Sequence, residues 1–141
     1  MLRYLLDTDL CVRVIRERSA FFRQRFEEER GGLAVSTIVV TELFVGAAKS
    51  MWPERNKELV ARLVSSFEVL PFDMKAAEHA ADIRAELERQ GRKIGPNDSL
   101  IAGHARSRGL IVVTGNIREF SRVDGLRCEN WLPERDGFHE D

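Results

Sequence analysis

Short apolar runs alternate with helical patterns along most of the chain, and this alternation constrains the fold more than any other feature. The strand-like runs lie at residues 2–6, 33–35, 67–70 and 110–113, with a weaker one at 126–128. The helical patterns lie at residues 8–29 in two pieces, 36–49, 54–66, 73–90 and 97–108. Strands that alternate with helices form a mostly parallel sheet covered by helices. The sequence therefore predicts the α/β fold class.

The length of the chain predicts one domain. The chain has 141 residues, and we expect the domain to cover residues 1–132, followed by a polar tail at 133–141. Its 22 basic and 23 acidic residues give a formal net charge of −1, which excludes a nucleic-acid binder that acts by bulk positive charge.

No apolar run approaches the roughly 18 residues of a membrane span. Because Cys11 and Cys128 lie in unrelated segments with no CxxC spacing, we expect reduced thiols in a cytoplasmic protein.

Several acidic and amide residues follow or interrupt the apolar runs. Asp7 ends the first strand-like run and Asn116 follows the fourth, where open α/β sheets place their ligands. Glu42 interrupts the apolar face of its helix, and Asp98 lies in the first turn of another. Each residue also has an explanation without chemistry. Asp7 could cap a helix, Glu42 could reach solvent, and Asp98 could interact favourably with a helix dipole. Glu119 alone is no more than a turn residue.

The combination of these acids is more informative than any one of them. Carboxylates without histidine or cysteine select hard cations such as Mg²⁺ or Mn²⁺, which hold phosphate oxygens and activate water. Without the four acids named above, 19 acidic residues remain against 22 basic ones. A basic loop, comprising Arg89, Arg92 and Lys93, comes shortly before Asp98. An acidic pocket in a weakly basic surface is what a nuclease needs, and this loop is a candidate RNA-binding segment.

Four segments of the chain resemble the PIN-domain ribonucleases, and specifically the VapC-type toxins of type II toxin–antitoxin pairs. They are LLDTD (5–9), STIVVTELFVGA (36–47), IRAELERQGRKIGPNDSLIAGHARSRGLIVVTGNIREF (83–120) and GLRCENW (125–131). The resemblance extends over about residues 1–132 in the family's order and spacing. It implies a Rossmann-like three-layer α/β/α sandwich, and a Mg²⁺-dependent endoribonuclease in which Mn²⁺ could substitute.

The resemblance also implies roles for individual residues. Asp7, Glu42 and Asp98 match the family's acidic triad and would bind the metal. The further catalytic positions of the family correspond to Asn116 and Glu119. Thr8 and Thr114 would be supporting residues, the latter holding the first aspartate.

The partners that the resemblance implies are an RNA substrate and a regulatory protein. Members of the family cut structured RNA, frequently tRNA. They are usually homodimers that a VapB-type antitoxin keeps inactive, and they reach promoter DNA only through that antitoxin.

The chain departs from the family pattern at three positions. Asp9 stands where the family usually has Asn, and we expect it to cap the first helix rather than bind a second metal ion. Asn116 stands where other PIN branches carry Asp, which leaves a second metal site open. Gly115 replaces a larger polar residue in the same turn.

The mechanism that follows is hydrolysis by a metal-activated water. Asp7 and Asp98 would ligate Mg²⁺, with Glu42 as a ligand or water-holding residue, and the products would be a 5′-phosphate and a 3′-hydroxyl.

One alternative is a haloacid-dehalogenase-like phosphatase with Asp7 as nucleophile and Asp9 as acid/base. Against it, Cys11 occupies the position of a Thr or Val in that family. A second alternative is a non-catalytic RNA-binding PIN module, which only Asn116 supports.

Overall fold

The computed structural model describes residues 1–17 and 20–131. The expected domain end at residue 132 and the expected tail at 133–141 lie outside these residues. The strands are β1 (Tyr4–Leu6), β2 (Leu33–Ser36), β3 (Glu68–Leu70), β4 (Ile111–Val113) and β5 (Cys128–Glu129). The helices are α1 (Thr8–Glu17), α2 (Ala20–Glu28), α3 (Thr37–Ala48), α4 (Pro53–Val64), α5 (Met74–Arg89), α6 (Pro96–Arg108) and α7 (Ile117–Phe120).

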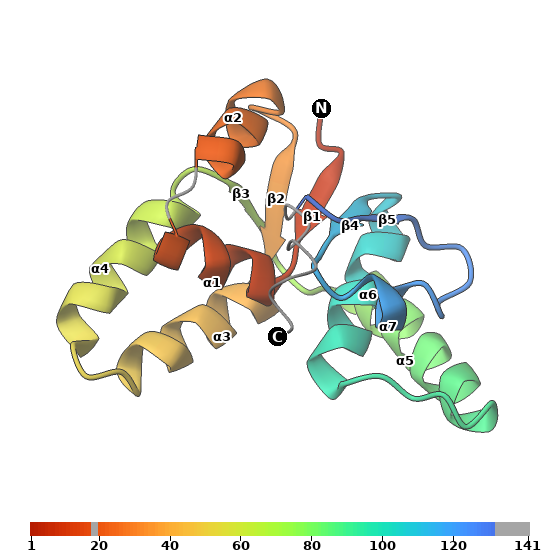
Figure 1. Cartoon of the computed structure of the whole chain (residues 1–141). Coiled ribbons are helices and arrows are strands. Elements are labelled where there is room, and N and C mark those ends of the chain that lie inside the picture. Colours follow the sequence, from red (N-terminus) through yellow and green to blue (C-terminus); the bar gives the residue numbers. More distant parts are fainter. Residues whose placement is uncertain (18–19, 132–141) are drawn as a thin grey trace, which may run out of the picture.

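The five strands form one parallel sheet in the order β3-β2-β1-β4-β5 (Figure 1). The register places Tyr4 of β1 beside Leu33 of β2 and Ile111 of β4. The chain moves outward from β1 to β3 and then returns across the sheet to β4. The strand order therefore reverses between β1 and β4, and open α/β sheets bind their ligands beyond the carboxyl ends of strands at such a point. The predicted α/β class and mostly parallel sheet are confirmed.

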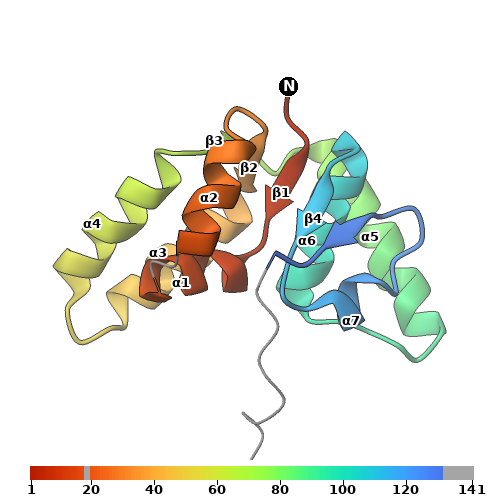
Figure 2. The same ribbon diagram turned by 45° about the horizontal axis from the view of Figure 1, so that its top comes forward.

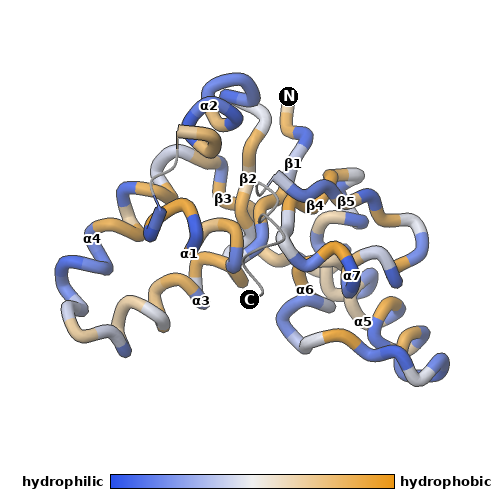
Figure 3. The backbone as a smooth tube through the Cα atoms, viewed as in Figure 1, coloured by the Kyte–Doolittle hydropathy of each residue, from blue (hydrophilic) through white to orange (hydrophobic). Residues whose placement is uncertain are grey.

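Helices lie on both sides of this sheet (Figures 1 and 2). In both views α1 to α4 gather beside β2 and β3, and α5 and α6 gather beside β4 and β5. The central strands β1, β2 and β4 are buried along their whole length, and their hydrophobic segments form the middle of the molecule (Figure 3). Hydrophilic and hydrophobic stretches alternate along the helices in the same view. This arrangement is the predicted three-layer sandwich.

Polar residues at the ends of strands begin the helices that follow. The hydroxyl of Ser36 accepts a hydrogen bond from the backbone N–H of Ile38 at 3.1 Å and caps α3. At the start of α1 the cap is Asp7, whose Oδ1 accepts from the backbone N–H of Leu10 at 2.9 Å. Asp9 lies inside the first turn of α1 instead, so the expectation that Asp9 caps this helix is wrong. A helix cap must precede the first helical residue, and Asp7 occupies that place.

Candidate active site

The carboxylate of Asp7 lies at the carboxyl end of the central strand β1. Its backbone N–H continues the ladder to β4 by donating to the carbonyl of Val113 at 3.0 Å. The side chain is 3% exposed, and both of its oxygens accept hydrogen bonds, Oδ1 from Leu10 and Oδ2 from the hydroxyl of Thr114. Burial raises the pKa of Asp7 from its ordinary 3.8 to about 6, although these two hydrogen bonds oppose the rise. The sequence indicated both a cap and a site residue here, and the geometry accommodates both.

Thr114 holds this carboxylate from the neighbouring strand. It follows β4 directly and is fully buried. Its Oγ1 donates to Asp7 and accepts from the backbone N–H of Asn116 at 2.8 Å. The backbone of Asn116 therefore belongs to the same network, while its partly exposed side chain begins α7 without capping it. The expected supporting position of Thr114 agrees with these contacts.

Glu42 reaches the same edge of the sheet from the second turn of α3. The hydroxyl of Thr8 donates to its Oε1, and the side-chain amide of Asn97 donates to its Oε2. The partly buried carboxylate is therefore held between the start of α1 and the start of α6. Asn97 was not among the residues that the sequence singled out for chemistry. Its position directly before Asp98 at the first turn of a helix was the available signal.

Asp98 and Glu119 form a second pair of acids beside Asp7. Burial raises the pKa of Asp98 from 3.8 to about 7, and the negative charges of Glu119, Asp7 and Asp9 add to the effect, as does a hydrogen bond with Glu119. Glu119 Oε1 also accepts from the backbone N–H of Gly95 at 3.3 Å, across 24 residues of sequence. Glu42 and Asp9 likewise raise the pKa of Asp7. The five acids therefore share one electrostatic environment although they come from separate segments.

This environment suits a divalent cation by the chemistry of its donors. Within the described residues, no three acidic, histidine or cysteine side chains are arranged closely enough to form a complete cation site. The available donors are carboxylate oxygens. Burial, and to a smaller extent the neighbouring negative charges, raises the pKa of Asp7 to about 6 and the pKa of Asp98 to about 7. A divalent cation would stabilise these buried negative charges, and oxygen donors are the ligands that Mg²⁺ and Mn²⁺ prefer. The residues present therefore fit a hard cation.

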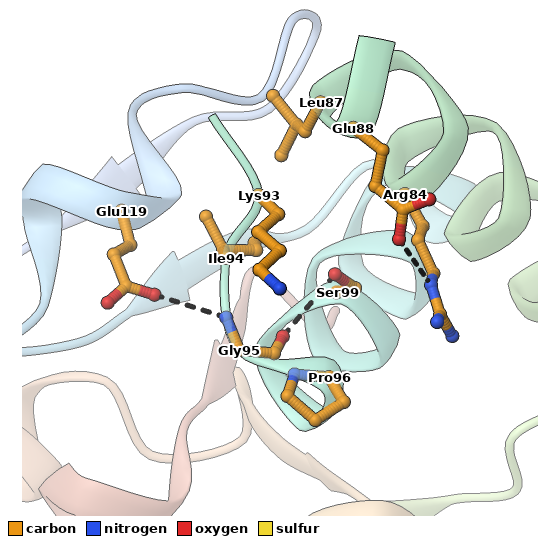
Figure 4. Close-up of a pocket in the computed structure, with 9 residues that line it drawn as sticks. All are labelled: Arg84, Leu87, Glu88, Lys93, Ile94, Gly95, Pro96, Ser99 and Glu119. Atoms are coloured by element: carbon orange, nitrogen blue, oxygen red, sulfur yellow. Dashed lines mark hydrogen bonds and ion pairs between the residues drawn. The ribbon is translucent and has the colours of Figure 1, made fainter. Parts of the chain in front are cut away.

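The three candidate RNA-binding cations have different surroundings. The guanidinium of Arg89 forms an ion pair with Glu86 on the exposed face of α5. The backbone carbonyls of Arg92 and Lys93 accept from the guanidinium of Arg122 at 3.4 and 3.3 Å. Lys93 lines a cavity that Glu119 also lines (Figure 4). Among the three, Lys93 is thus the cation that the structure brings beside the acids.

The PIN domain family model matches residues 4–126 of the chain, which is most of its length. The chain belongs to the PIN domain family. The tRNA(fMet)-specific endonuclease VapC of Shigella flexneri is 51% identical over 131 residues, covering 93% of this chain and 99% of that protein. The ribonuclease VapC2 of Haemophilus influenzae is 47% identical over 132 residues, covering 94% of this chain and 100% of that protein.

Solved structures agree with these relationships. A chain in the crystal structure of DNA-bound VapBC from Salmonella typhimurium matches this PIN domain with a TM-score of 0.92. The two chains are 47% identical, and the match covers 94% of this chain and 100% of that one. A VapBC2 from Rickettsia felis, bound to a DNA fragment from its promoter, matches with a TM-score of 0.89, 35% identity, and coverage of 93% and 100%.

These similarities confirm the predicted family and activity. The PIN domain is a VapC-type endoribonuclease, the toxin component of a toxin–antitoxin pair. They favour this interpretation over the phosphatase alternative, in which Asp7 and Asp9 would act together. In the part of the chain that the structure describes, no helix combines the length and the apolar character needed to cross a bilayer.

Proposed function

We propose that this PIN domain cleaves tRNA(fMet) in a Mg²⁺-dependent hydrolysis. The observation that carries the proposal is the gathering of Asp7, Glu42, Asp98 and Glu119 beyond the carboxyl ends of β1 and β4, in a chain 51% identical to a VapC that acts on that tRNA. Such a site has carboxylate ligands of the kind that a metal-dependent nuclease uses.

In this proposal Asp7 and Asp98 bind Mg²⁺ directly, and Glu42 acts as a third ligand or holds the attacking water. When bound there, Mg²⁺ supplies the positive charge that lowers the pKa of a water molecule and stabilises the phosphate in the transition state. Mn²⁺ would substitute because it accepts the same oxygen ligands.

The chain's own residues prepare this arrangement. Thr114 and the N-terminus of α1 fix both oxygens of Asp7, so its carboxylate does not have to reorient when the substrate arrives. Thr8 and Asn97 do the same for Glu42. Asp98 must release its proton before it can act as a ligand, and Glu119 is placed to share that proton while the site is empty of substrate. Asn116, whose backbone is fixed by Thr114, would present its side chain to the substrate or a water.

A cleavage experiment tests this function. The purified protein, freed of any small partner, is incubated with a total tRNA pool in Mg²⁺ or in EDTA, and the ends of each fragment are mapped. We expect discrete cleavage of tRNA(fMet) in Mg²⁺, 5′-phosphate ends, and no cleavage in EDTA. Asp98→Asn should be inactive while it keeps its far-ultraviolet circular dichroism spectrum. Fragments with 2′,3′-cyclic phosphate ends, or cleavage that survives EDTA, would contradict the mechanism.

We further propose a VapB-type antitoxin as the inhibitory partner, contact with promoter DNA only through that antitoxin, and a homodimer. The solved VapBC complexes from Salmonella typhimurium and Rickettsia felis, both bound to DNA, support the first two points. Co-expression with a candidate VapB-type antitoxin, followed by size-exclusion chromatography with light scattering, would measure complex formation and the oligomeric state. Promoter binding by the toxin alone would contradict the proposal.

A further inference from the structure

A cavity of about 450 Å³ opens beside the acidic site, between α5, the loop before α6, and α7 (Figure 4). Its apolar wall is formed by Leu87, Ile94 and Pro96, and its polar rim includes Lys93 and Glu119. The figure shows Glu119 on one side, directed at the backbone nitrogen of Gly95, and an Arg84–Glu88 ion pair of 2.9 Å on the other. The cavity therefore combines an apolar wall with charged edges.

The cavity is continuous with the proposed catalytic residues. Glu119 lines the cavity and forms a hydrogen bond with Asp98. Gly95 also lines it, and a Cβ atom at that position would lie only 3.3 Å from Oδ2 of Asp98. Because adjacent nucleotides are joined by a single phosphate, a nucleotide next to a phosphate at Asp98 is close enough to reach this opening.

The chemistry of the walls matches one unstacked nucleotide. Nucleases that cut structured RNA recognise bases held out of the stack, and such bases bind in apolar clefts with a few polar groups at the edge. Exposed Pro96 would contact the face of a base, together with the small parts of the largely buried Leu87 and Ile94 side chains that line the cavity. Within the described residues, the ammonium of Lys93 forms no ion pair, so it is available to a phosphate of the same strand.

We propose that this cavity is a nucleobase-binding subsite, which receives the base of a nucleotide next to the scissile bond while Lys93 contacts the RNA backbone. The inference rests on the proposed ribonuclease function and adds the place where the enzyme reads its substrate. The apolar contact with Ile94 then carries selectivity for that nucleotide, and Lys93 carries affinity that depends on salt.

Binding without cleavage tests the subsite. Once the cut is mapped, tRNA(fMet) is assembled with a single abasic ribonucleotide at each position flanking it, and binding is measured in EDTA by fluorescence anisotropy. We expect one abasic RNA to bind about three- to tenfold more weakly than the unmodified RNA. Ile94→Ala should weaken binding of the unmodified RNA to a similar extent, without weakening binding of that abasic RNA further. Ile94→Val, with a smaller loss, serves if Ile94→Ala does not fold.

Lys93 is tested separately because it should not distinguish the two RNAs. Lys93→Ala should weaken both equally and reduce the slope of log K against log salt by about one. Lys75→Ala, at the start of α5 and paired with Glu78 at 4.0 Å, is the matched control and should bind like the wild type. An equal loss for Lys75→Ala would overturn the role of Lys93.

Three further results separate failure of the subsite proposal from failure of the proposed ribonuclease function. If the wild type cuts tRNA(fMet) but binds every abasic RNA as well as the unmodified one, the subsite proposal alone is wrong. If Ile94→Ala binds RNA normally and loses the co-purifying antitoxin, the cavity belongs to a protein partner and the proposal is again wrong. If the wild type neither cuts nor binds tRNA, both the subsite proposal and the proposed function are wrong.

Discussion

Thr114 donates its hydroxyl proton to the buried carboxylate of Asp7, and the same oxygen accepts the backbone N–H of Asn116 at 2.8 Å. The backbone N–H of Asn116 uses a lone pair of the hydroxyl oxygen, so the single hydroxyl proton remains for the ionised carboxylate, which can only accept. Asp7 is therefore held as an acceptor on both oxygens, with the N-terminus of α1 on one side and β4 on the other. The central strands and the proposed ligand are thus fixed to each other by a single side chain.

Thr114→Val removes this donor while it keeps the shape of the side chain. We expect the free energy of unfolding to fall by about 1–3 kcal/mol, because a buried carboxylate and a backbone N–H lose their partner. The cleavage rate should fall about 10–100-fold, the usual effect of removing a residue that orients a ligand. Urea unfolding and single-turnover cleavage measure the two effects, and Thr114→Ser should restore both. An active Thr114→Val enzyme would mean that Asp7 needs no such support.

Asn97→Ala should affect the reaction more than the fold. Its side chain is exposed and donates to Glu42 from the start of α6, so the free energy of unfolding should change by less than about 0.5 kcal/mol. Because Glu42 then loses one of its two donors, we expect kcat to fall about tenfold with KM for tRNA unchanged. Thr8→Ala, which removes the other donor, should act in the same direction. A change in KM alone would instead assign Asn97 to substrate binding.

Asp98→Asn should stabilise the metal-free protein at neutral and alkaline pH. The folded protein raises the pKa of Asp98 from 3.8 to about 7, so between these values it binds a proton that the unfolded chain releases. Ionisation of Asp98 thus lowers the stability of the wild type as pH rises through this window. In EDTA the variant should match the wild type near pH 4 and exceed it by about 1 kcal/mol at pH 8, a value reduced for solvent screening. A difference that does not depend on pH would contradict this account.

Gly103→Ala should prevent close packing of α5 against α6. A Cβ at Gly103 would lie 2.4 Å from the backbone nitrogen of Ala80, so one helix must move. We expect a loss of about 3 kcal/mol in the free energy of unfolding. Gly46→Ala in α3 is the matched control, because no atom lies within 4 Å of its added Cβ. That variant should gain about 0.5–1 kcal/mol, since alanine favours the helix. Thermal unfolding of both variants would test the contrast.

Much of this architecture could be predicted from local patterns. The apolar run at residues 110–113 and the helical patterns at residues 73–90 and 97–108 depend on neighbouring residues only, and the structure has β4, α5 and α6 there. The wrong assignment at Asp9 has a geometric cause. A shift of one or two residues in the start of α1 decides which aspartate becomes the cap, and the sequence does not determine helix ends that closely.

The contacts between distant segments are what the sequence could not provide. The bond from Asn97 to Glu42 spans 55 residues, and the contact of Glu119 with Gly95 spans 24. Such pairs depend on how the helices are placed against the sheet, so they follow from packing rather than from any local motif. Similarly, the basic loop was predicted as a group, yet the fold gives Lys93 and Arg89 different surroundings.

The order of the strands has a consequence during synthesis. Asp7 is made more than a hundred residues before β4, which pairs with β1, and before Thr114, which follows β4 directly. Until then the central strand has no neighbour on one side, and the first acid has neither its hydroxyl donor nor the partner acids at positions 98 and 119. A chain that ends before residue 119 therefore lacks part of the acidic site, and we expect cleavage activity only after these later segments have been made and have folded onto β1.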